Sequence, residues 1–109
     1  MGEYKDYMTK ELDNGTVNIN EDVINTIAAA AIRDVEGVVS QQNDRKAIHV
    51  TLGEDVELVC GLVVVYGHSV VEIARNVQKA VTNAVESMTG FKVARVDVNV
   101  TGISMGKQG

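Results

Sequence analysis

The stretch that decides the fold is Val56–Gly90, which reads VELVCGLVVVY, then GHS, then VVEIARNVQKAVTNAVESMTG. Its first part, Val56–Tyr66, is an almost unbroken apolar run of strand length. Gly67 and His68 form a turn, and the residues after them open a helix that stops at Gly90. A second strand, Val93–Thr101, follows at once. A strand, a helix and a strand in this order predict two parallel strands joined by a crossover.

Alternation along the first strand gives it two faces. One face holds Val56, Leu58, Cys60, Leu62, Val64 and Tyr66, and the other holds Glu57, Val59, Gly61, Val63 and Val65. Both faces are largely apolar, which is typical of a central strand covered on both sides. If both helices lie on one face, an apolar strip of Val59, Val63 and Val65 stays open, and self-association would cover it. These three valines are the candidate interaction face.

The helix after the turn is the best-marked element. Ser69 and Glu72 fit a capping box at its start. Its apolar stripe is predicted to be Ala74, Val77, Val81, Ala84, Val85 and Met88. In the last strand, one face is predicted to hold Ala94, Val96, Val98 and Val100, and the other Arg95, Asp97, Asn99 and Thr101.

Upstream, the chain shows a similar pattern. Thr16–Ile19 alternates as a short strand, and Asn20 caps a helix that is expected to end at Gly37. Val38 and Val39 indicate a short strand. Ala47–Leu52 alternates and is expected to pair antiparallel with the central strand through a hairpin connection.

These elements predict an α/β fold, a two-layer sandwich in which two helices pack on a mixed sheet of three to five strands. We expect residues 1–14 to be a flexible leader, residues 15–103 a single domain and residues 104–109 a polar tail. A chain of 109 residues has room for one domain.

Charge and composition weigh against several functions. The net charge is −5, which disfavours nucleic acid and direct adhesion to an anionic membrane. No apolar run approaches the roughly 20 residues of a membrane span, so no membrane insertion is expected. The single Cys60 cannot form an internal disulfide and fits a reducing, cytoplasmic location.

Candidate sites are few. Gly67, His68 and Ser69 lie at a helix N-terminus, where an anion can bind, although a turn with a cap explains them better. A KH-type RNA-binding module using this turn, with Arg75 and Lys79 on the helix, is an alternative; such modules use a loop with two glycines, and one is present here. His49, His68 and Cys60 lack metal-ligand spacing. No catalytic residue, metal or cofactor is expected, so the chain is not expected to be an enzyme.

The chain resembles the alkaline shock protein family of Gram-positive bacteria. The resemblance spans about residues 15–103. It rests on Gly15–Ile19, Ile27–Ala28, Val35–Val38, Val64–Gly67, Glu72–Gln78, Val85–Gly90 and Val96–Ile103. The chain departs from the family at Val71, where proline is common, and in a shorter connection after Val39.

The resemblance implies a non-enzymatic protein of the general-stress and envelope-stress response. Family members have no established catalytic residues. They are cytoplasmic, some self-assemble, and some reach the membrane through a membrane-anchored partner protein. The resemblance therefore implies a protein-interaction scaffold that forms homo-oligomers or binds such a partner.

Overall fold

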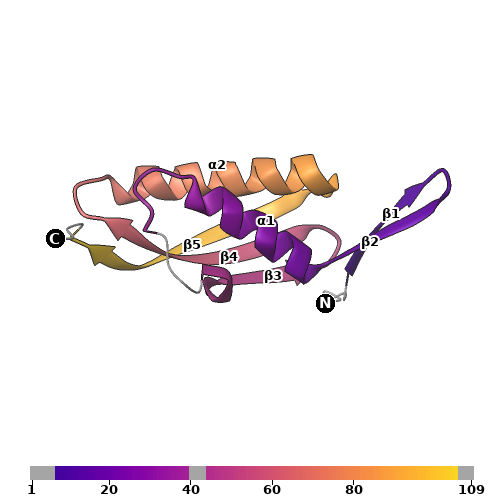
Figure 1. The fold of residues 1–109 in the computed structure, drawn as a ribbon, viewed down its shortest axis with the longest axis horizontal. Helices are drawn as coiled ribbons and strands as arrows, with labels where there is room; N and C mark the ends of the chain where they lie inside the picture. The colour runs from indigo at the N-terminus through magenta and orange to yellow at the C-terminus, as the bar shows by residue number, and fades with distance from the viewer. Residues whose placement is uncertain (1–6, 40–43, 106–109) are drawn as a thin grey trace.

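A computed structural model describes residues 7–39 and 44–105 of the chain. The elements follow in the order β1 (Tyr7–Leu12), β2 (Gly15–Asn20), α1 (Glu21–Arg33), a short 3-10 helix (Asp44–Ala47), β3 (Ile48–Leu52), β4 (Val56–Val65), α2 (Val70–Thr89) and β5 (Val93–Ser104). Both helices lie on one side of the sheet formed by β3, β4 and β5 (Figure 1). The predicted α/β sandwich is therefore confirmed, with three strands in its main sheet.

The main sheet is mixed, and β4 is its central strand. β3 pairs antiparallel with β4, and β5 pairs parallel with β4. The side chains of β4 that face the helices are fully buried. They are Val56, Leu58, Cys60, Leu62 and Val64. They form one continuous core with the buried stripes of the two helices, as the alternation of β4 predicts.

The helix α2 begins and ends where its capping residues predict. Ser69 Oγ accepts a hydrogen bond from the Glu72 backbone N–H at 3.3 Å. Gly90, at φ +77°, donates its N–H to Glu86 O. The predicted stripe is wrong at Met88, whose side chain is 72% exposed. The buried stripe runs in steps of four instead, through Ile73, Val77, Val81, Val85 and Thr89.

The helix α1 is shorter than predicted. Asn20 caps it, since its side chain accepts from the Val23 N–H at 3.2 Å. It ends at Arg33 and not at Gly37, which instead lies in a following turn at φ +94°. That turn delivers Val38 to an antiparallel bridge with β4. The pairing of Val38 with β4 therefore accounts for the end of α1 before Gly37.

Two register shifts interrupt β5. The pairing with β4 skips Ala94 near the start of β5 and Thr101 near its end. At the second shift, Thr101 Oγ1 donates to Leu62 O at 3.1 Å. The simple alternation predicted for this strand therefore holds only between the shifts. Tyr66, predicted on the buried face of β4, lies just beyond the strand and is 65% exposed.

The N-terminal hairpin corrects the predicted flexible leader. β1 and β2 pair antiparallel across residues 13–14, so the prediction is wrong for residues 7–14, while residues 1–6 lie outside the described chain. Met8 anchors the hairpin, since it is only 7% exposed and opposes Ile19. Lys10 Nζ donates to Gly90 O at 3.2 Å, at the C-terminus of α2, where positive charge is favourable.

The hairpin projects from one end of the molecule (Figure 1) and makes the protein elongated. Its principal extents are 54 × 30 × 22 Å and its radius of gyration is 15.1 Å. A compact domain of this length has a radius of gyration of about 13 Å. In the described chain, no helix is long and apolar enough to cross a membrane.

Candidate interaction face

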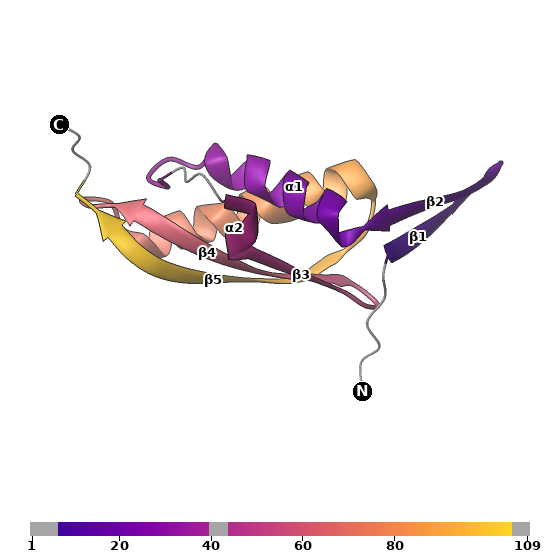
Figure 2. The ribbon, with the colours of Figure 1, turned by 60° about the horizontal axis from the view of Figure 1, so that its bottom comes forward.

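The side of the main sheet that points away from the helices is here called the open face. Neither α1 nor α2 packs on it, because both lie on the other side of the sheet (Figure 2). Ala47, at the end of the short 3-10 helix, lies beside Gly61 on this face. By strand alternation and register it comprises His49, Thr51, Glu57, Val59, Gly61, Val63, Val65, Arg95, Asp97, Asn99 and Gly102. The three predicted valines are half-buried within the monomer.

The apolar part of the open face follows β4 toward its C-terminal end. Val59, Val63 and Val65 lie in one line along the strand, separated by Gly61. Their neighbours across the sheet are small or polar, because Val63 opposes Gly102 and Val65 opposes Ser104. The valines thus form a narrow apolar ridge that is half-buried between small and polar neighbours.

The polar part lies at the other end of β4, in two cross-strand rows. Thr51, Glu57 and Arg95 form the first row. His49, Val59 and Asp97 form the second, which we call the His49 row. The Arg95 guanidinium donates from Nε to both carboxylate oxygens of Asp97 at 3.0 and 3.1 Å, and this hydrogen bond raises the pKa of Arg95. The open face therefore has positive charge near one edge of β5 and negative charge immediately beside it.

The turn at residues 67–69 has a structural role, because it joins β4 to α2. Gly67 is at φ +103°, a conformation that favours glycine, and Ser69 caps α2. Gly67, His68 and Ser69 are all exposed. Glu72 places a carboxylate in the first turn and pairs with Arg75 at 3.3 Å. A carboxylate in the first turn makes this helix N-terminus less favourable for a second anion.

The histidines and the cysteine lie apart. His49 belongs to the open face, whereas Cys60 is completely buried on the helix side of β4. Burial raises the pKa of the Cys60 thiol to about 11, which keeps it protonated and unreactive. Within residues 7–39 and 44–105, no three His, Cys, Asp or Glu side chains gather as a metal-binding group.

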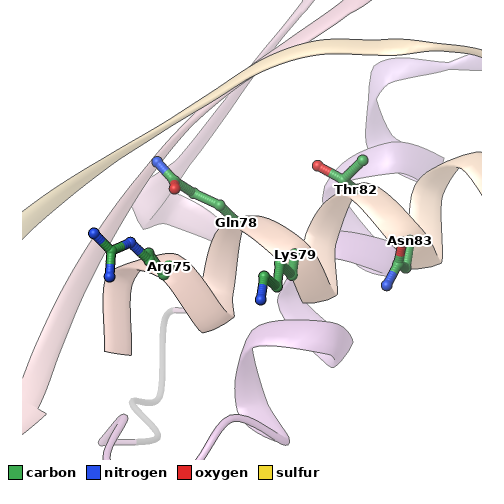
Figure 3. A pocket seen from close by; sticks show the side chains of 5 residues that line it. All are labelled: Arg75, Gln78, Lys79, Thr82 and Asn83. Carbon is green, nitrogen blue, oxygen red and sulfur yellow. The ribbon is translucent and has the colours of Figure 1, made fainter. Parts of the chain in front are cut away.

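A shallow groove runs along the outer surface of α2. It has a volume of about 440 Å³ and is lined by Arg75, Gln78, Lys79, Thr82 and Asn83 (Figure 3). Gln78 is already engaged, since its amide donates to Val96 O at 3.0 Å. The sequence pointed to Arg75 and Lys79 on this helix, and it did not single out Asn83.

Comparison with known proteins identifies the family. A family model for the alkaline shock protein 23 family, with a cell envelope-related function, matches residues 40–105, more than half of the chain. The chain belongs to this family. The resemblance found in the sequence is thereby confirmed. One alkaline shock family relative, the uncharacterized protein YqhY of Bacillus subtilis (strain 168), is 26% identical over 106 residues, covering 82% of this chain and 77% of YqhY.

Solved structures with a similar fold include forms of the MamM CTD. A copper form is 18% identical, with a TM-score of 0.52, and the match covers 76% of this chain and 98% of that one. A cadmium form is 19% identical, with a TM-score of 0.51, and covers 75% and 95%. At this level of identity the likeness shows a shared fold and nothing about function.

Proposed function

We propose that this protein is a non-enzymatic scaffold of the envelope and general stress response, which acts in the cytoplasm by binding other protein chains through its open face. The observation that carries the proposal is the ridge of Val59, Val63 and Val65 on the side of the sheet that neither α1 nor α2 covers. Exposed apolar strips of this kind are typical of interaction sites. The partner is a second copy of the chain or a membrane-anchored protein.

Membership of the family supports the proposed role in the cell envelope. Its model is described by a cell envelope-related function. A protein attached to a membrane through a partner needs no span of its own. The open face is the surface that we propose for binding such a membrane-anchored partner.

The test replaces Val63 with glutamate in the middle of the ridge. A buried, unpaired carboxylate would make association strongly unfavourable, so Val63→Glu should be monomeric by light scattering at concentrations where the unmodified chain associates. Val71→Glu is the matched control, because Val71 is 60% exposed in the first turn of α2, where negative charge is tolerated. Association that persists in Val63→Glu would refute the role of the open face.

A KH-like RNA-binding module is the second candidate. It is favoured by the two cations, Arg75 and Lys79, in the groove on α2. The net charge of −5 and the pairing of Arg75 with Glu72 weigh against it. Retention of RNA that falls steeply with added salt would support this candidate. No retention of RNA even at low salt would exclude it.

A further inference from the structure

We propose that the side-chain amides of Asn25 and Gln78 block the two edges of the main sheet, so that the protein resists the addition of a strand from another chain. The sheet order β3-β4-β5 leaves β3 and β5 as edge strands. An edge strand presents unpaired backbone N–H and C=O groups, which are a template for pairing with a further strand. This inference goes beyond the proposed function, because it concerns the edges of the sheet and not its open face.

On β3, alternate residues direct their backbone groups away from β4. The backbone N–H of Val56 bonds on the β5 side of the sheet, so its partner Leu52 directs its own backbone groups outward. Alternation makes Ile48 and Val50 face outward as well. Asn25, on α1, donates from its side-chain amide to Ile48 O at 3.0 Å. In the described chain, Val50 and Leu52 are the outward-facing residues of β3 that remain for an incoming strand.

On β5, a second amide comes from α2. Gln78 donates from its side-chain amide to Val96 O at 3.0 Å, which places the backbone groups of Val96 on the outer edge. By alternation, Val98 and Val100 also face outward. The register shift at Thr101 then interrupts the row, and a bulge of this kind turns an edge strand away from regular pairing. Val98 and Val100 therefore remain between the amide and the shift.

The two edges are thus restricted to a similar degree. Each keeps two outward-facing residues in a row, whereas an ordinary strand of roughly five or six residues offers three. β3 has only 5 residues, and short edge strands pair poorly. β5 has 12 residues and also carries the ion pair of Arg95 and Asp97, which is a further obstacle to pairing. A partner is therefore expected to reach this protein through side chains and not by extending its sheet.

Gln78 could instead serve only to tie α2 to β5, and two substitutions separate these roles. Gln78→Met keeps the length of the side chain but leaves Val96 O open to an incoming strand. Gln78→Glu also loses the donor, yet it places a negative charge at the edge, and charge at an edge opposes strand pairing. A purely structural tie predicts the same behaviour from both variants. A blocked edge predicts strand addition in Gln78→Met alone.

The test follows assembly of the folded protein by light scattering, with the infrared amide I band to detect strand pairing between chains. The Val63→Glu variant serves as background, so that association through the open face does not contribute. Gln78→Met should form strand-paired assemblies severalfold faster than this background, and Gln78→Glu should not. Asn25→Met should accelerate assembly less, because β3 is the shorter edge.

Two control variants separate edge pairing from its possible imitations. Asn83→Met adds the same apolar side chain to the outer surface of α2, away from the contact with Val96. Ser69→Ala removes the cap of α2 and so lowers stability without touching either edge. Both controls should assemble no faster than the background. Circular dichroism establishes that each variant is folded, and Gln78→Ala takes the place of Gln78→Met if the latter does not fold.

Strand-paired assembly by Gln78→Met, with none by Gln78→Glu or the two controls, supports the blocked edge. Equal assembly by Gln78→Met and Asn83→Met would trace the effect to added apolar surface and overturn the proposal. Equal assembly by Gln78→Met and Gln78→Glu, or none by either, would overturn it as well. Should the Val63→Glu background itself associate, the proposed function fails, while the difference between Gln78→Met and Gln78→Glu still decides the role of the amide.

Discussion

Replacing Met8 with alanine should release the β1–β2 hairpin and leave the main sheet intact. Met8 is the hairpin residue most deeply buried against the core, at 7% exposure. Shortening a buried methionine to alanine costs 2–5 kcal/mol in general. Because Met8 lies at the margin of the core, the lower figure of about 2 kcal/mol applies. An isolated two-stranded hairpin is marginally stable in water, so this loss falls on the hairpin alone.

The assay is hydrogen exchange, resolved by residue. A loss of about 2 kcal/mol corresponds to roughly thirtyfold faster exchange through local opening. That acceleration is expected for the amides that join β1 to β2, with no change in β4 or α2. Val17→Ala is the control, because Val17 lies on the same hairpin but is 40% exposed. Equal acceleration in α2, or none in the hairpin, would refute the reasoning.

Three further predictions concern α2 and β4. Ser69→Ala removes the cap from Glu72 N–H and should lower the free energy of unfolding by about 1 kcal/mol in urea; an unchanged midpoint would contradict this. Lys10→Met keeps the aliphatic stem but loses the contact with Gly90 O, and should speed exchange in the hairpin at low salt and less so at 1 M salt, where screening is strong. Burial raises the pKa of Cys60 from 9.0 to about 11, so the thiol ionises first in the unfolded chain. The stability that the protonated, buried thiol contributes is complete below pH 9 and is lost as the pH rises to about 11. Across that window, the free energy of unfolding of the unmodified chain should fall by on the order of 2–3 kcal/mol relative to that of Cys60→Ala. Parallel profiles of unfolding free energy against pH for the two chains would disprove this.

The sequence was most informative where one residue acts on its own neighbours. The caps at Asn20 and Ser69 and the αL glycine at Gly90 act within a single turn of chain, and all three lie at the predicted helix ends. The two faces of β4 follow from alternation alone, which is why the sequence predicts that Val59, Val63 and Val65 lie on the side away from the helices.

What the sequence could not show depends on partners distant in the chain. β1 contains one deeply buried apolar residue, Met8, and becomes a strand only by pairing with β2. The early end of α1 depends on Val38 reaching β4. The register shifts at Ala94 and Thr101 have no local sequence signature. Because the sequence does not give the register between strands, it could not predict that His49, Val59 and Asp97 lie in one cross-strand row.

The elongated shape affects how the size of this protein should be measured. A molecule 54 Å long and 22 Å thick diffuses more slowly than a sphere of the same 11.7 kDa mass. On a gel-filtration column calibrated with globular standards, a monomer with its hairpin extended would elute early and would be mistaken for a larger species. Release of the hairpin would alter the elution volume with no change in mass. Sedimentation equilibrium and light scattering, which report mass independently of shape, are the methods that separate a monomer from a dimer here.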